Sequence, residues 1–131
     1  MSVITGDEAA PRVAGKPRVI VTRRLLPANH ARMAELFDVV LNEQDQPMSR
    51  DELIAAMQDC DVLVPAVTDR IDAQMIAEAG GRLGLIANFG AGYEHIDMAA
   101  ARTRGMMVTN TPGVFTEDTA DLTMALIILA T

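Results

Sequence analysis

The chain has 131 residues, half of them apolar, with no Trp and a single Tyr, so it can form one compact domain with an aliphatic core. Its formal net charge of −7 argues against the clustered basic face that binding to nucleic acid or to an anionic membrane surface requires.

The N-terminal segment, the apolar runs and the cysteine count bear on location. Residues 1–16 contain Pro11 and two glycines and lack the long apolar stretch of a signal peptide, so we interpret them as a flexible tail. The longest apolar run, residues 124–130, is far shorter than the roughly 20 residues of a membrane helix. Cys60 has no second cysteine with which to form a disulfide, and we interpret it as structural. These features predict a cytoplasmic protein.

The first half of the chain alternates short β-branched runs with helical patterns. Val19–Thr22 is the first predicted strand, a helix is expected to begin at Pro27, and Val39–Leu41 is the second strand. The apolar positions of that helix are Met33, Leu36 and Phe37. A third strand, Val62–Val64, is expected after a second helix.

The second helix carries a start signal in its sequence. Ser49 followed by Glu52 matches the capping box, in which each residue satisfies a backbone amide of the other. The apolar stripe of this helix is Leu53, Ile54 and Met57.

The second half repeats the pattern. Asp72 is expected to cap a helix, Leu83–Ala87 is the fourth strand, Asp97 caps a short helix, Met107–Thr109 is the fifth strand, and Thr116 caps the last helix. The apolar positions after Asp72 are Met75, Ile76 and Ala79. A strand followed by a helix five times predicts an α/β fold: a flavodoxin-like open parallel five-stranded sheet with helices on both faces.

The final segment is unusual for a surface helix. From Met124 onward it is apolar on nearly all sides, and a helix of that kind needs burial all round. We expect either a partner or a further part of the protein to cover it. The alternative is a core helix in a complete small fold.

Ligands of open parallel sheets bind at the carboxyl ends of the strands, where the fourth strand leads into NFGAGYEHID, residues 88–97. Gly90 and Gly92 suggest a dinucleotide loop, but His95 stands where the third glycine is required, and Asp97 caps the next helix. A receiver domain is also disfavoured, because Pro65 replaces the phosphate-accepting aspartate. Flavodoxin would need a phosphate loop in place of TRRLLP.

The glycine pair suits a small anion better. Two glycines around a small residue let backbone amides converge on one carboxylate, in a nest-like cradle. A tight glycine turn without a ligand is the alternative interpretation of the same residues.

The combination of NFGAGYEHID, GMMVTNTPGVFTEDTADLTMALI and DVLVPAVTDRIDAQMI strongly resembles the D-isomer-specific 2-hydroxyacid dehydrogenases, in particular the glyoxylate/hydroxypyruvate reductase branch. The resemblance covers about residues 17–131. It implies a two-domain oxidoreductase in which hydride passes between NAD or NADP and a small 2-oxo acid bound in the interdomain cleft. It further implies that residues 17–115 form the substrate-binding domain and that residues 116–131 form an interdomain helix leading to a Rossmann domain.

The same resemblance implies roles for individual residues. The amides of Ala91 and Gly92 would bind the substrate carboxylate, with Gly90 shaping the loop, and Val67 would touch the substrate's small side group. Thr119 would lie against the nicotinamide at the domain junction; otherwise it is simply the N3 position of the last helix.

Tyr93 is open to two interpretations, and the remaining residues of these loops are given a structural role only. Tyr93 either lines the cleft or packs at the loop edge, and Asn88 is expected to tie the loop backbone together. We interpret His95 as a surface or loop residue, and Arg23 and Arg24 as a solvated loop.

In the family, the catalytic Arg, Glu and His and the glycine fingerprint for the cofactor belong to sequence beyond residue 131. The resemblance therefore predicts a chain with no catalytic residue and no metal ligand of its own, inactive alone, whose parent enzyme is a homodimer. The alternative is a stand-alone module that binds small carboxylates or a partner protein.

Overall fold

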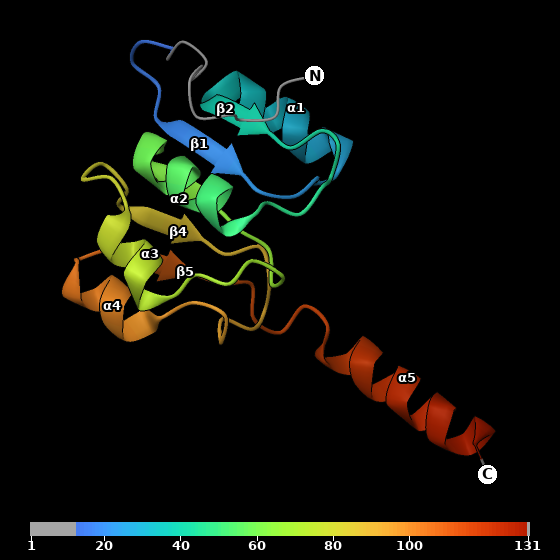
Figure 1. The fold of residues 1–131 in the computed structure, drawn as a ribbon. Helices are drawn as coiled ribbons and strands as arrows, with labels where there is room; N and C mark the ends of the chain where they lie inside the picture. Colours follow the sequence, from blue (N-terminus) through green and yellow to red (C-terminus); the bar gives the residue numbers. More distant parts are fainter. Residues whose placement is uncertain (1–12, 131) are drawn as a thin grey trace.

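The structure is a computed structural model that describes residues 13–130. Over these described residues, five strands and five helices alternate, as predicted (Figure 1). The elements are β1 (Arg18–Val21), α1 (Pro27–Leu36), β2 (Asp38–Leu41), α2 (Arg50–Asp59), β3 (Val62–Val64), α3 (Ala73–Glu78), β4 (Leu85–Ala87), α4 (Met98–Thr103), β5 (Met107–Thr109) and α5 (Thr116–Leu129). Most of the tail predicted for residues 1–16 lies outside the described residues, and residues 13–16 form an exposed turn whose Lys16 Nζ bonds the carbonyl of Glu35.

The strands form one parallel sheet in the order β2-β1-β3-β4-β5, which confirms the flavodoxin-like α/β prediction. The chain steps outward from β1 to β2, then returns past β1 to β3 and continues to β5. Because crossovers between parallel strands are right-handed, this reversal places α1 on the face opposite to α2, α3 and α4. The carboxyl ends of β1 and β3 meet at the point of reversal, where ligand sites of such sheets occur.

The main core lies between the sheet and the layer of α2, α3 and α4. Ile20, Leu63 and Ile86 supply the central side chains of the sheet, and each is almost fully buried. The helices contribute Leu53, Ala56, Met57, Met75, Ile76 and Ala101. Arg104, just after α4, donates to the carbonyls of Ile76, Ala77 and Ala79 at the end of α3, so the two short helices are fastened to each other.

The helix start signals are largely confirmed. Ser49 and Glu52 form the capping box, with the Ser49 amide 2.7 Å from the Glu52 carboxylate. Asp72 and Asp97 cap α3 and α4 through bonds of 3.0 and 2.9 Å to backbone amides. The exception is α5, where Phe115 is the N-cap residue and makes no side-chain capping bond, and Thr116 is already helical. The predicted cap at Thr116 is therefore wrong by one position.

Three smaller expectations are corrected. β4 begins at Leu85 instead of Leu83, whose side chain is nevertheless buried in the core. β1 runs one residue earlier than predicted, so Thr22 lies just beyond its end. Leu36 does not belong to a buried stripe of α1, since its side chain is exposed at the last position of that helix.

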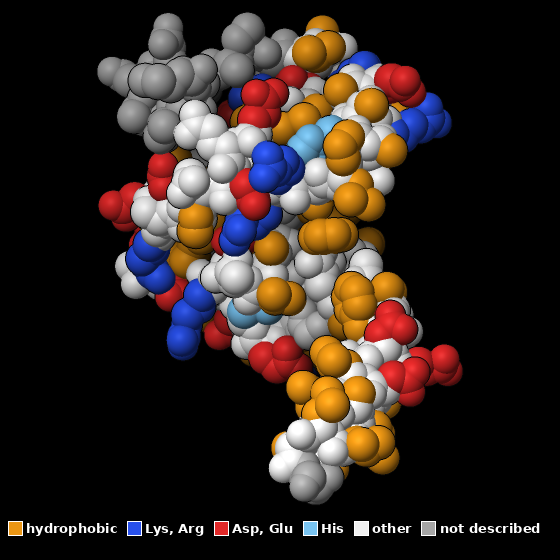
Figure 2. All heavy atoms as spheres, turned by 90° about the vertical axis from the view of Figure 1, so that its right-hand side faces the viewer, with side chains coloured by type: hydrophobic (Ala, Val, Ile, Leu, Met, Phe, Trp, Pro, Cys, Tyr) orange, Lys and Arg blue, Asp and Glu red, His pale blue; other side chains and the backbone are white. Residues whose placement is uncertain are grey.

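Helix α5 extends away from the body of the domain, and its apolar side chains are exposed (Figures 1 and 2). The large exposed side chains on it are Leu122, Met124, Leu126, Ile127, Ile128 and Leu129. Figure 2 shows hydrophobic side chains both over this helix and on the neighbouring surface of the domain. Within residues 13–130, no helix combines the length and the apolar character needed to cross a membrane.

Candidate functional site

The loops after β3 and β4 run side by side at the carboxyl edge of the sheet. The amide of Phe89 donates to the carbonyl of Pro65 at 2.8 Å, and farther along the amide of Ile71 donates to the carbonyl of His95 at 2.8 Å. Two isolated parallel bridges, Ala66 with Phe89 and Ile71 with Ile96, extend the β3–β4 pairing into these loops. Val67 and the segment 88–93, called the glycine loop below, are therefore held next to each other by backbone pairing.

A buried aspartate fixes the loop after β3. Asp69 is 3% exposed, and its carboxylate accepts bonds from the Thr22 hydroxyl and, at 2.9 Å, from the Ala66 amide. Thr22 directly follows β1, so this contact joins the chain ends of β1 and β3 at the switch point of the sheet. The turn 66–69 is closed further by the Asp69 amide, which donates to the Ala66 carbonyl at 3.0 Å. Val67, at the tip of the turn, is left 56% exposed toward the glycine loop side.

The carbonyl oxygens of the glycine loop are held by two asparagine side chains. Asn88, which is 3% exposed, donates from Nδ2 to the carbonyls of Gly90 and Gly92 at 3.2 and 2.7 Å. Asn110 follows β5, and its Nδ2 donates to the carbonyl of Ala91 at 2.7 Å. The prediction that Asn88 ties the loop backbone together is confirmed.

The amides of the same loop are available. Within residues 13–130, the N–H groups of Gly90, Ala91 and Gly92 make no hydrogen bond to other protein groups. Three successive N–H groups without a protein acceptor, at the carboxyl edge of a sheet, are suited to binding an anion.

The glycines are needed for space and not for a left-handed backbone. Neither Gly90 nor Gly92 has a positive φ, so the alternating conformation of a nest, which motivated the sequence interpretation, is not the arrangement here. A methyl group on Gly90 would instead lie 2.5 Å from Cγ1 of Val67, and one on Gly92 would lie 2.6 Å from a carboxylate oxygen of Glu94. Gly90 and Val67, two of the predicted site residues, are thus in close approach.

The structure brings together Val67, Gly90, Ala91 and Gly92, with Tyr93 half-exposed at the end of the loop. It does not bring Thr119 to them. Thr119 is the fourth residue of α5 and not N3; its amide bonds Phe115 and its carbonyl accepts from Thr123.

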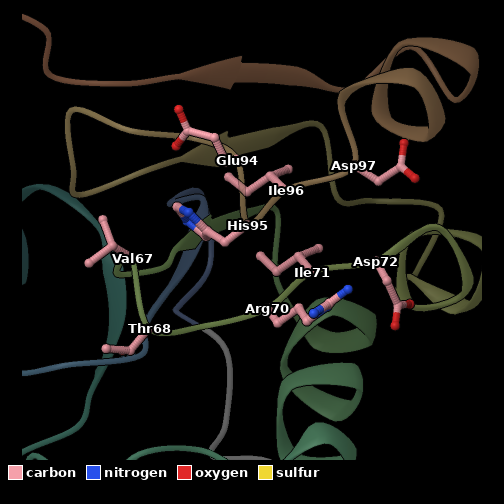
Figure 3. Close-up of a pocket in the computed structure, with 9 residues that line it drawn as sticks. All are labelled: Val67, Thr68, Arg70, Ile71, Asp72, Glu94, His95, Ile96 and Asp97. Carbon is pink, nitrogen blue, oxygen red and sulfur yellow. The ribbon is translucent and has the colours of Figure 1, made fainter.

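A shallow hollow of about 340 Å³ adjoins the glycine loop on the side of the β3 loop. Figure 3 shows the His95 ring directed toward Val67 with Glu94 beside it, while Arg70 and Asp72 lie toward the other end. The described residues hold no cluster of three or more His, Cys, Asp or Glu side chains placed to bind a metal ion.

His95 lies in a loop, as the sequence interpretation expected, and its side chain is partly buried. Its Nε2 lies 3.1 Å from Oδ1 of Asn88, an oxygen that only accepts, so the neutral ring carries its proton on Nε2. Burial lowers the pKa of His95 below its ordinary value of 6.5, although the carboxylates of Asp69 and Glu94 act in the opposite direction.

This lowered pKa predicts an acid-sensitive loop. The unfolded chain binds a proton near pH 6.5 more readily than the folded chain does, so stability is expected to fall as the pH drops below 6.5. Urea denaturation of the wild type and of His95→Gln at pH 7.5 and pH 5.5 measures the effect. The variant should lose less stability between these pH values, and equal losses would contradict the prediction.

Arg23 corrects a further expectation. It is not a freely solvated residue, because its Nε lies 3.0 Å from the Asp45 carboxylate and its Nη1 lies 3.2 Å from the Thr68 hydroxyl. The loops after β1, β2 and β3 are joined through this side chain.

Two site residues were missed from the sequence. Asn110 could have been found from its position, since β4 and β5 pair in register, with Ala87 beside Thr109, which sets Asn88 beside Asn110. Asp69 left only a weak signal, an aspartate in a short polar turn after a strand.

The sequence matches a known protein family and several known relatives. Residues 19–126 match the family model described as D-isomer specific 2-hydroxyacid dehydrogenase, catalytic domain. A glyoxylate reductase of Korarchaeum cryptofilum is 43% identical over 115 residues, which are 88% of this chain and 34% of that protein. The chain thus spans about a third of the length of such relatives.

Solved structures give the same relationship. A protein from Thermus thermophilus with a crystal structure shares 40% sequence identity with this chain. The two structures superpose with a TM-score of 0.73 over 85% of this chain and 35% of that one. An NADPH-dependent glyoxylate/hydroxypyruvate reductase from Sinorhizobium meliloti, in complex with NADP and malonate, is 30% identical with a TM-score of 0.63. The match covers 86% of this chain and 34% of that one.

Proposed function

The chain belongs to the D-isomer specific 2-hydroxyacid dehydrogenase family, and from this we propose that residues 17–115 are the substrate-binding domain of an NAD(P)H-dependent reductase of small 2-oxo acids such as glyoxylate or hydroxypyruvate. The observation that carries the proposal is the glycine loop, whose carbonyls are occupied while its amides stay open. The amides of Ala91 and Gly92 bind the substrate carboxylate. Gly90 allows the close approach of Val67, which touches the substrate's small side group, and Tyr93 lines the cleft.

The proposed reaction moves a hydride from the reduced nicotinamide to the carbonyl carbon of the 2-oxo acid, while a proton adds to the carbonyl oxygen to give the 2-hydroxy acid. This chain's part is to bind and orient. Two amides fix the carboxylate end of the substrate, and an exposed apolar side chain, Val67, restricts what fits beside it. None of the described residues is assigned as the acid–base group for the carbonyl oxygen, because Nε2 of His95 is hydrogen-bonded to Oδ1 of Asn88.

The described residues do not fit the phosphates of a dinucleotide. The helix after the glycine loop, α4, has six residues, and its N-cap residue Asp97 already accepts a bond from the Ala100 amide at 2.9 Å. A phosphate there would meet a negative charge. We therefore assign cofactor binding to a separate part of the parent enzyme, a cytoplasmic homodimer, with α5 as the interdomain helix and Thr119 as the contact to the nicotinamide.

Titration of the ¹⁵N-labelled chain with glyoxylate tests the proposal. We expect the amide signals of Ala91 and Gly92 to shift in a saturable way, whereas glycolaldehyde, which lacks the carboxylate, leaves them in place. The chain alone should not oxidise NADH or NADPH in the presence of glyoxylate. Equal shifts with both compounds would show that the loop does not recognise the carboxylate, and no shift with glyoxylate would show that the loop is a glycine turn without a ligand.

A further inference from the structure

Each peptide group of the glycine loop has a carbonyl on one edge and an N–H on the other, and hydrogen bonds to the carbonyls determine which way each N–H points. In a planar trans peptide the carbonyl and the N–H point in opposite directions. The carbonyl of Gly90 shares its peptide with the amide of Ala91, and the carbonyl of Ala91 shares its peptide with the amide of Gly92. A side chain that holds one of these oxygens therefore determines where the next amide points.

Asn88 and Asn110 together hold all three carbonyls from Gly90 to Gly92. Nδ2 of Asn88 lies 3.2 Å from the Gly90 oxygen and 2.7 Å from the Gly92 oxygen, and Nδ2 of Asn110 lies 2.7 Å from the Ala91 oxygen. The backbone amide of Thr111 adds a second bond to the Gly90 oxygen at 2.9 Å. Asn88 is itself fixed in place, because its backbone amide donates to the Thr109 carbonyl at 3.0 Å and its side chain is buried.

The same bonds strengthen the amides as donors. A carbonyl that accepts a hydrogen bond polarises its peptide group, so the N–H on the other side becomes more positive. Asn88 acts in this way on the amides of Ala91 and Tyr93, and Asn110 acts on the amide of Gly92. The Asn88 carboxamide is oriented by these bonds: its Nδ2 faces the carbonyls of the loop, and its Oδ1 lies 3.1 Å from Nε2 of His95.

We propose that Asn88 and Asn110 are positioning residues for carboxylate binding, which hold the carbonyls of the glycine loop inward and so present its amides to the substrate. The inference rests on the proposed function of the loop. It assigns to two side chains, neither of which touches the substrate, the work of preorganising the anion site before the ligand arrives.

Asn110→Ala is the variant of choice, because Asn110 is only half-buried whereas Asn88 is packed inside. Asn42→Ala is the matched control. Asn42 also bridges two backbone carbonyls at the same edge of the sheet, those of Thr22 and Gln46 at 2.8 and 2.7 Å, but it does not contact the glycine loop.

Glyoxylate affinity and amide chemical shifts of the 131-residue chain give the test. We expect Asn110→Ala to weaken glyoxylate binding about tenfold, the effect of losing one hydrogen bond that orders a charge-binding donor, and Asn42→Ala to change it less than about twofold. In the absence of ligand, Asn110→Ala should move the amide signal of Gly92 most, and Asn88→Ala those of Ala91 and Tyr93. This residue-specific pattern is not expected from general loosening of the fold.

An Asn110→Ala chain that binds glyoxylate as tightly as the wild type would overturn the positioning role and leave the proposed function standing. Equal weakening by Asn42→Ala would overturn it as well, since the effect would then be general. A wild-type chain that does not bind glyoxylate would overturn the proposed function, and the positioning role with it.

Discussion

Replacing Arg18 with methionine is expected to lower the free energy of unfolding by about 3–5 kcal/mol, the usual cost of removing one partner from a buried ion pair. The Arg18 side chain is 3% exposed, and its Nη1 lies 3.1 Å from Asp38 and its Nε 2.7 Å from Asp59. Burial alone would lower the pKa of Arg18, but the bonds to Asp38 and Asp59 outweigh it and raise the pKa. Methionine keeps the aliphatic volume and leaves the Asp38 carboxylate buried without its cation.

Arg32→Met is the matched control for this experiment. Arg32 pairs with Glu35 at 2.8 Å, but both side chains are about two-thirds exposed, and such pairs contribute about 0–1 kcal/mol. A double variant, Arg18→Met with Asp38→Leu, should recover part of the loss because no buried charge then remains unpaired. Urea denaturation followed by circular dichroism measures all three. Similar losses for Arg18→Met and Arg32→Met would contradict the assignment.

The location of this ion pair separates stability from binding. Arg18 and Asp38 begin β1 and β2, at the amino edge of the sheet, whereas the glycine loop follows the carboxyl end of β4. The folded fraction of Arg18→Met should therefore keep the glyoxylate response of the wild type. The sheet stabilises one edge with buried charge and leaves the other edge free for polar backbone groups.

Local sequence patterns predicted most of the fold because the relevant interactions are local. The two residues of a capping box are only three positions apart, so Ser49 and Glu52 predict the start of α2 correctly, and the aspartate caps of α3 and α4 follow the same logic. Phe115 was not predicted as the N-cap residue of α5 because it makes no side-chain capping bond, and Thr116, a residue type that often caps helices, was chosen in its place.

The site was less predictable because its contacts join distant segments. The bond between Thr22 and Asp69 spans 47 positions, and that between Asn110 and Ala91 spans 19. Each depends on how neighbouring strands pair, so it becomes visible only once the strand order of the fold is used. The glycine pair was recognised correctly as a special loop, but for a reason other than its true one: Gly90 is required by a methyl group of Val67, 23 positions earlier, and not by its own φ.

That close approach predicts the second large effect. Gly90→Ala is expected to reduce stability by about 1–3 kcal/mol, the usual cost of overpacking, and to weaken glyoxylate binding at least about tenfold. The new methyl group would lie 2.5 Å from Cγ1 of Val67, so either the turn 66–69 or the glycine loop must move. Both are fastened: the turn by the buried Asp69 carboxylate, and the loop by Asn88.

The clash can be relieved without restoring the glycine. Val67→Ala removes Cγ1, and the other neighbours of the new methyl group, Asn88 Nδ2 at 3.5 Å and the Gly92 oxygen at 3.6 Å, are at ordinary contact distance. Gly90→Ala in the Val67→Ala background should therefore cost much less than in the wild type, in both stability and glyoxylate affinity. Gly92→Ala is the comparison, since the Glu94 carboxylate that it would meet ends a flexible side chain and can turn away. A Gly90→Ala cost that is the same in both backgrounds would mean that the glycine serves the backbone of the loop and that Val67 and the glycine loop do not act as one site.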